Sequence, residues 1–203
     1  MLDRPLRQAK EALFRPFVNG PLYRLKPDWV TRCACGVGLA CALAAAFACY
    51  RLAFGLWWLN RFLDGLDGSL ARAQGSQSDW GGYQDIVLDH IVYAVIPIGI
   101  AYSTQNPTNL GACSLLQACY FVNTISWCYL AALLEKRQLG AQARGEMTST
   151  TMPPALIEGT ETVIFFSLFL AFPAWCGWLF SLKALLVAVG VWQRWRCARE
   201  VLR

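Results

Sequence analysis

Long apolar runs follow one another through most of this chain, and they constrain its fold more than any other feature. The first run, from Cys33 to Tyr50, contains no charged residue. A helix that crosses a bilayer needs about 20 mostly apolar residues. Because 56% of the residues are hydrophobic and only 15% are charged, we expect an integral membrane protein rather than a soluble globular domain.

The apolar runs predict six transmembrane helices in one all-α domain that covers residues 1–203. Turn signals such as TQNPTNLG, MPP and FPAWCG separate the runs. The longest polar connection, residues 135–154, is only a loop, so no soluble domain is expected. The expected spans are residues 33–50, 52–73, 83–104, 112–134, 157–173 and 177–194.

The first 26 residues differ from the spans because they are basic and contain no long apolar run. Residues 1–26 therefore do not resemble a cleavable signal peptide. We expect this segment to form an amphipathic interfacial helix on anionic lipid, with a disordered basic tail as the alternative. One face of that helix can carry the apolar residues Leu6, Leu13, Phe14 and Phe17.

Lys and Arg residues gather on one side of the expected bilayer. They occur in the N-terminal segment, in the loop after residue 135 and at the C-terminus, whereas the turns 105–111 and 173–177 carry no charge. Positive charge near the ends of spans is retained in the cytoplasm. We therefore expect both termini to be cytoplasmic, together with the turn between the second and third spans. Arg51 is the exception to this charge distribution, because it lies between the first and second spans, on the opposite side. Lys183, inside the last span, is expected to snorkel outward.

Five aspartates lie between residues 63 and 90, at the cytoplasmic ends of the second and third spans: Asp64, Asp67, Asp79, Asp85 and Asp89. Each ionised side chain at membrane depth costs roughly 2.5–3.5 kcal/mol, so a group of them requires a partner. Asp64 and Asp67 are three residues apart, and Asp85 and Asp89 are four apart. Each pair therefore shares one face of its helix, and the four carboxylates can converge.

Converging carboxylates without Cys or His favour a hard divalent cation, Mg²⁺ or Mn²⁺, and two ions are plausible. Such ions commonly bridge to substrate phosphates. Interleaved glycines keep the backbone accessible to a bulky ligand. The alternative is a set of solvated helix-end carboxylates that pair with Arg61 and Arg72. The pattern predicts phosphoryl chemistry at the membrane surface, with the candidate metal ligands Asp64, Asp67, Asp85 and Asp89.

The spacing of these residues resembles the signature of a known enzyme family. From Asp64 to Asp89 the chain follows the pattern D-x2-D-G-x2-A-R-x8-G-x3-D-x3-D. This pattern resembles the complete motif of the CDP-alcohol phosphotransferases, also called CDP-alcohol phosphatidyltransferases. The segment 27–31, PDWVT, resembles the family's Pro-Asn-x-aliphatic-Thr entrance to the first span, with Asp28 as a departure.

The resemblance implies transfer of a phosphoalcohol group from a CDP-linked donor to an acceptor hydroxyl, with release of CMP, by a metal-dependent homodimer in a bacterial-type inner or plasma membrane. CDP-diacylglycerol is the expected donor, a soluble CDP-alcohol is the alternative, and the signature does not identify the acceptor. By similarity, Asp64, Asp67 and Asp85 hold the metal ions. Asp89 completes the cluster and is the general base for the acceptor's proton. The residues implied to bind the CDP moiety are Gly68, Ala71, Arg72, Ser78 and Thr31.

Several other polar residues leave two interpretations open. Arg61 lies one helical turn before the first aspartate, so it can bind an acceptor phosphate or pair with the aspartates. Glu158 and Glu161 begin the fifth span, where they either stabilise the positive end of the helix or line an acceptor pocket. Further candidates for that pocket are Asn123 and Ser126.

Two other functions fit this pattern less well. An intramembrane prenyltransferase also joins aspartates to a metal-bound diphosphate, but its pattern lacks the Ala-Arg pair and the following spacing. A cation channel or transporter would distribute its carboxylates along a pore, whereas these cluster at one end. No feature indicates binding to nucleic acid, because membrane orientation and contact with anionic lipid explain the net charge of +5.

Overall fold

The computed structural model describes residues 14, 16–18, 20–140, 157 and 159–202, and all regular structure in these parts is helical. The all-α class is thus confirmed, and each expected span overlaps one α-helix. The elements are the 3₁₀-helix η1 (Pro21–Arg24), α2 (Pro27–Ala46), α3 (Tyr50–Ala73), α4 (Asp79–Thr104), α5 (Pro107–Lys136), α6 (Gly159–Ala171), the 3₁₀-helix η2 (Pro173–Trp175) and α7 (Cys176–Leu202).

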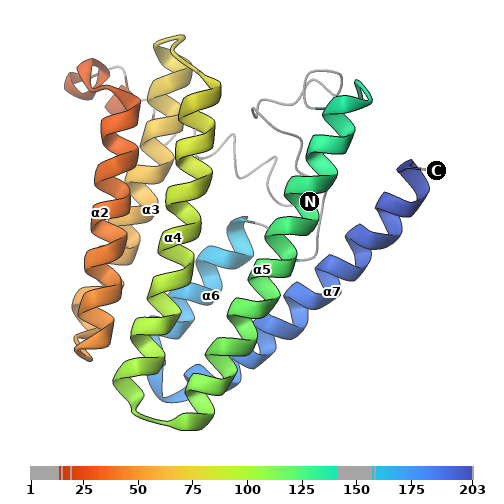
Figure 1. Cartoon of the computed structure of the whole chain (residues 1–203). Helices are drawn as coiled ribbons and strands as arrows, with labels where there is room; N and C mark the ends of the chain where they lie inside the picture. Colours follow the sequence, from red (N-terminus) through yellow and green to blue (C-terminus); the bar gives the residue numbers. More distant parts are fainter. Residues whose placement is uncertain (1–13, 15, 19, 141–156, 158, 203) are drawn as a thin grey trace.

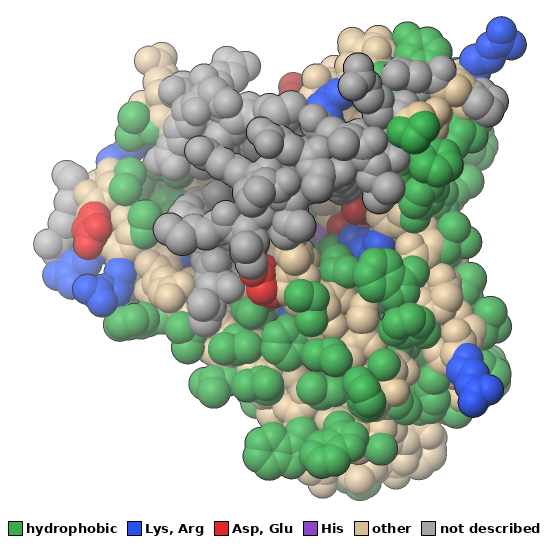
Figure 2. Space-filling model, turned by 180° about the vertical axis from the view of Figure 1, so that it is seen from behind, with side chains coloured by type: hydrophobic (Ala, Val, Ile, Leu, Met, Phe, Trp, Pro, Cys, Tyr) green, Lys and Arg blue, Asp and Glu red, His purple; other side chains and the backbone are tan. Residues whose placement is uncertain are grey.

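Three stretches of the described helices are long and apolar enough to cross a membrane: Pro27–Ala46, Asp79–Thr104 and Pro173–Leu202. Helix α6 is apolar but shorter. Figure 2 shows hydrophobic side chains over most of the lower part of one face of the molecule. These features are those of a membrane protein, and the crossing of the bilayer by all six α-helices stays a prediction.

The helices form two groups, which are joined by α6 and by direct contact of α4 with α5. Helix α2 packs against both α3 and α4, α5 packs against α7, and α6 contacts α3, α4 and α7. In Figure 1 the turn between α3 and α4 lies toward the same, upper end as the C-terminus, while the turns after α2 and α4 lie at the lower end. The turn between the two aspartate-bearing helices and the C-terminus therefore share one end, and the side of the membrane that this end faces stays a prediction.

The first long helix is displaced from its expected position. It begins at Pro27 rather than Cys33 and ends at Ala46 rather than Tyr50. Proline is favoured in the first turn, where its missing N–H costs no helical hydrogen bond. Ala48 has a φ of 58° and ends the helical path. Hydropathy places the start too late because Asp28 and Arg32 interrupt the apolar pattern.

The described part of the N-terminal segment packs on protein. Phe14 and Val18 are buried against a small core that includes Leu66 and Leu70 of α3. The ring of Phe17 lies 5.4 Å from that of Phe62. Phe14 therefore faces α3 rather than lipid. The other residues of the expected apolar face, Leu6 and Leu13, lie outside the described residues, so the interfacial helix stays a prediction.

The expectation that Lys183 snorkels outward is wrong, because its side chain is 0% exposed. Its Nζ lies 4.6 Å from the ring centroid of Phe166. The faces of aromatic rings attract an ammonium group, so they replace part of the hydration that burial removes. The other rings around Nζ belong to Tyr120, Phe165 and Phe169.

Helices α2 and α4 approach each other closely at two glycines. A Cβ on Gly99 would collide with the carbonyl oxygen of Ala42, and a Cβ on Gly38 would collide with the side chain of Val92. The small residues thus allow the two helices to lie side by side over their length (Figure 1). This close packing sets the distance between the polar face of α4 and the start of α2.

We expect Gly99→Ala to destabilise the protein by about 1–3 kcal/mol, because the methyl group meets a backbone atom that cannot move alone. The midpoint of thermal unfolding in detergent should fall by several degrees. Gly36→Ala is the matched control on α2, since a Cβ there meets no atom within 4 Å. An equal loss of stability in both variants would contradict the close-packing argument.

Candidate active site

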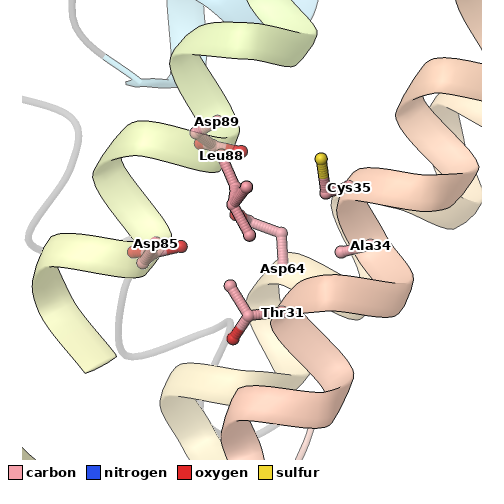
Figure 3. Close-up of a pocket in the computed structure, with 7 residues that line it drawn as sticks. All are labelled: Thr31, Ala34, Cys35, Asp64, Asp85, Leu88 and Asp89. Atoms are coloured by element: carbon pink, nitrogen blue, oxygen red, sulfur yellow. The ribbon is translucent and has the colours of Figure 1, made fainter. Parts of the chain in front are cut away.

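Helices α2, α3 and α4 together line a small polar pocket near the end of the bundle that carries the α3–α4 turn. Three of the four predicted metal-ligating aspartates line it, and they come from two helices (Figure 3). The spacing argument therefore placed these carboxylates correctly at one location. The residues that line the pocket are Thr31, Ala34 and Cys35 of α2, Asp64 of α3, and Asp85, Leu88 and Asp89 of α4.

The fourth predicted ligand, Asp67, is buried on α3 next to this group. The residue is only 5% exposed. Oδ1 accepts a hydrogen bond from the backbone N–H of Gly68. Oδ2 is buried and has no hydrogen-bond partner within the described part of the chain. An unpaired buried acceptor is costly, so this oxygen is suited to a cation.

A metal site is not preformed by side chains alone. Within the described ranges, no group of three or more His, Cys, Asp or Glu side chains lies close enough to hold a metal ion. The predicted convergence of four carboxylates is therefore only partial. The donor set nevertheless consists of carboxylate oxygens, which suit Mg²⁺ or Mn²⁺. Repulsion between like charges favours separation of the carboxylates unless a cation lies between them.

Arg61 supplies a positive charge to this group. Its Nη2 donates to Oδ1 of Asp89 at 2.7 Å, and its Nη1 donates to Oδ2 of the same carboxylate at 3.3 Å. The Nη1 atom also lies 3.6 Å from Oδ2 of Asp64. Of the two interpretations left open for Arg61, the structure therefore shows the pairing with the aspartates.

Uncharged neighbours hold Arg61 in place, and sequence analysis did not identify them. Nη1 donates to the hydroxyl of Tyr93 at 2.7 Å, and Nε donates to Oδ1 of Asn60 at 2.8 Å. The guanidinium lies 4.8 Å from the ring centroid of Trp57. A spacing argument could have found Tyr93, because it follows Asp89 by four residues and shares its helix face.

The residues predicted to bind CDP lie on α3, at the start of α4 and on α2. The guanidinium of Arg72 lies over Gly68: a Cβ added to this glycine would be 3.3 Å from Nη1 of Arg72. Arg72 also donates to Oγ of Ser69 at 3.3 Å. Gly68, Arg72 and the intervening Ala71 thus form one surface of α3. Its contact with a nucleotide stays a prediction.

Two other predicted CDP-binding residues have local hydrogen bonds. Oγ of Ser78 accepts from the backbone N–H of Gly81 at 3.1 Å and caps the first turn of α4. Oγ1 of Thr31 donates to the carbonyl of Pro27 at 3.1 Å, while the residue lines the pocket. Ser78 therefore has a structural role as a cap, and nucleotide binding by either residue stays a prediction.

The candidate acceptor residues are not gathered in this pocket. Asn123 and Ser126 of α5 instead accept hydrogen bonds from Nη1 of Arg194, at 2.9 and 3.4 Å. Arg194 is only 5% exposed, although it lies in the basic C-terminal part of the chain. Glu161 lies in the first turn of α6 and is not among the lining residues. Glu158 lies outside the described residues.

The family is shown by comparison with known proteins. Residues 25–193 match the CDP-alcohol phosphatidyltransferase family model, which covers most of the chain. This chain belongs to the CDP-alcohol phosphatidyltransferase family of membrane transferases. Enzymes of the family are generally metal-dependent and use a CDP-alcohol as substrate. The match confirms the resemblance seen in the motif and argues against the prenyltransferase and channel interpretations.

Three relatives illustrate the range of the family. The inner membrane protein YnjF of Escherichia coli is 36% identical over 179 residues, which cover 86% of this chain and 84% of YnjF. A phosphatidylinositol phosphate synthase of Cutibacterium acnes is 28% identical over 159 residues, covering 74% and 72% of the two chains. An archaetidylinositol phosphate synthase of Pyrococcus horikoshii is 35% identical over 100 residues, covering 43% of this chain and 51% of that protein.

We expect Asp67→Asn to weaken the binding of Mn²⁺ by at least about 10-fold, because the buried Oδ2 loses its charge. Isothermal titration of Mn²⁺ into the purified protein measures this affinity. The control is Asp79→Asn, since Asp79 is exposed in the first turn of α4 and lies outside the motif. Equal Mn²⁺ affinity in Asp67→Asn and the unmodified protein would contradict the assignment.

Proposed function

We propose that this enzyme transfers a phosphatidyl group from CDP-diacylglycerol to the hydroxyl of an acceptor alcohol and releases CMP. The observation that carries the proposal is that three members of the family motif, Asp64, Asp85 and Asp89, line the same pocket. The motif accounts for the CDP half of the donor. A lipid donor is favoured because the pocket lies between helices of which α2 and α4 are apolar enough to cross a membrane.

The ligands proposed for Mg²⁺ or Mn²⁺ are Asp64, Asp67 and Asp85. Two features support this assignment: all three supply carboxylate oxygens, and Oδ2 of Asp67 is buried without a hydrogen-bond partner in the described residues. Bound divalent ions would neutralise the diphosphate and stabilise the charge that develops on the CMP leaving group. Asp89 is proposed as at most a weaker ligand, since Arg61 already contacts both of its oxygens.

Asp89 is proposed as the general base. It lies one helical turn beyond Asp85, toward the middle of α4, where an acceptor can enter beside the lipid phosphate. The acceptor oxygen forms a bond to the phosphatidyl phosphorus, the bond from that phosphorus to CMP breaks, and the acceptor's proton passes to Asp89. Positioned proton transfer of this kind typically contributes 10²–10⁴-fold to the rate.

The donor nucleotide is proposed to lie along the α3 surface formed by Gly68, Ala71 and Arg72. The small residues leave space for cytidine, and the guanidinium of Arg72 can bind a phosphate oxygen at two points. Thr31 and Ser78 lie at the starts of the neighbouring helices α2 and α4. We further propose that this site faces the cytoplasm and that the enzyme is a homodimer.

The acceptor is proposed from the relatives whose names state an activity. The Cutibacterium acnes protein is named a phosphatidylinositol phosphate synthase, and the Pyrococcus horikoshii protein is named an archaetidylinositol phosphate synthase. Inositol phosphate is therefore the first acceptor to test, followed by inositol, glycerol phosphate, serine and phosphatidylglycerol. Labelled acceptors, each incubated with purified protein and CDP-diacylglycerol, will identify the one that enters the lipid fraction.

The reaction class is tested by release of CMP. Purified protein with CDP-diacylglycerol, an acceptor mixture and Mg²⁺ or Mn²⁺ should release CMP, and excess chelator should abolish the release until the ion is restored. Quantification of CMP by chromatography measures both effects. Full activity in excess chelator, or no CMP with any acceptor or CDP-alcohol, would reject the proposed function.

Asp89→Asn should lower kcat by about 10²–10⁴ and leave the affinity for CDP-diacylglycerol within a few-fold, because the amide keeps the shape but cannot accept the proton. CMP-release rates and calorimetric titration of the donor measure the two halves of this prediction. Asp79→Asn serves again as the control, with unchanged rates expected. Joint loss of donor binding and turnover would identify Asp89 as a metal ligand instead.

A further inference from the structure

Arg61 has few donors left for a substrate. A guanidinium carries five N–H donors. Four hydrogen bonds from Arg61 reach protein atoms: both oxygens of Asp89, the hydroxyl of Tyr93 and Oδ1 of Asn60. Asp64 lies 3.6 Å from the same group. One N–H of Nη2 remains, so a two-point contact with an acceptor phosphate would require displacement of one of these partners.

Two aromatic rings also lie close to the guanidinium. Its central carbon lies 4.8 Å from the ring centroid of Trp57 and 5.1 Å from that of Tyr93. Trp57 is 0% exposed, and its Nε1 donates to Oγ of Ser167 on α6 at 3.1 Å. The Arg61 side chain is itself only 8% exposed. The nearby rings and the hydrogen bonds together restrict movement of the guanidinium.

The contacts of Arg61 also join three helices at the pocket. Asn60, beside Arg61 on α3, donates through Nδ2 to the carbonyl of Ala34 on α2 at 2.8 Å. Arg61 continues this connection from α3 to Asp89 on α4. Ala34 and Asp89 both line the pocket (Figure 3). Asn60 and Arg61 together therefore connect opposite walls of the site.

We propose that Arg61 is a positioning residue for the transfer reaction: it fixes the orientation of the Asp89 carboxylate in the pocket and does not bind the acceptor. The inference rests on the proposed function and deepens it. A two-point contact from a rigid guanidinium restrains rotation of the carboxylate, whereas a single ammonium does not. Neither the family motif nor the pocket lining includes Arg61.

The first test is Arg61→Lys, which keeps the charge and removes the planar two-point contact. We expect kcat for CMP release to fall by about 10²-fold, as for small misplacements of a reacting group. The KM values for CDP-diacylglycerol and for the acceptor should change only a few-fold. An increase confined to the acceptor KM would overturn the proposal and identify Arg61 as an acceptor-binding residue.

A double-mutant cycle separates positioning through Arg61 from an independent effect of its neighbour. Tyr93→Phe removes one hydrogen bond to Nη1, so it should lower kcat less than Arg61→Lys. Because Tyr93 acts through Arg61, the double variant should have about the same kcat as Arg61→Lys alone. If the fold-reductions in kcat of the two single variants multiply in the double variant, the coupling is contradicted.

A third measurement does not depend on activity. The carboxylate stretching band of Asp89 can be identified in infrared spectra by its loss in Asp89→Asn. We expect Arg61→Lys to shift this band, because the contact of the carboxylate with two N–H groups is lost. An unshifted band, or a lower unfolding midpoint with unchanged kcat, would reduce Arg61 to a structural residue and overturn the proposal.

The matched control is Lys183→Met. Lys183 also contacts the aromatic cluster, since its Nζ lies 4.6 Å from Phe166, whose ring stacks on Trp57 at 5.0 Å. No salt bridge joins Lys183 to a carboxylate of the described residues, so kcat should stay within a few-fold. A loss of kcat equal to that of Arg61→Lys would show that the effect comes from the aromatic rings and would overturn the proposal.

If unmodified protein releases no CMP, the proposed function fails, while the infrared measurement still tests the role of Arg61.

Discussion

The contact between the Arg61 guanidinium and the Asp89 carboxylate is the interaction on which the site depends. Charges buried together must compensate one another, since removal of one partner leaves an uncompensated charge and is strongly destabilising. Here the compensation extends further, because Arg61 also lies near Asp64 and against the rings of Trp57 and Tyr93. Side chains of α3 and α4 are thereby held in one arrangement around the pocket before any substrate arrives.

Close helix packing brings the other wall of the pocket into place. Gly99 and Gly38 allow α2 and α4 to approach until backbone and side-chain atoms are in contact. As a result, Thr31, Ala34 and Cys35 face the aspartates of α3 and α4 (Figure 3). The hydrogen bond from Asn60 to Ala34 then connects this wall to the charged group. Packing of small residues and pairing of charges thus depend on each other.

The candidate site lies within one of the two helix groups. Helices α2, α3 and α4 carry the complete family motif, which accounts for the CDP donor. Helices α5 and α7 form a separate pair, where Arg194 is held by Asn123 and Ser126. Members of the family share the donor chemistry but are named for different products. A motif confined to three helices is compatible with such variation in the rest of the bundle.

The sequence by itself determined the class of protein, the approximate positions of the α-helices and the region that holds the aspartates. These features depend on local periodicity, because residues three or four apart share a helix face whatever surrounds the helix. Only the tertiary structure decided which groups from other helices meet that face. Arg61 pairs with Asp89, Arg194 with Asn123, and Lys183 with aromatic rings rather than lipid. These contacts join residues distant in sequence, and the rotation and spacing of packed helices, which no local pattern encodes, determine them.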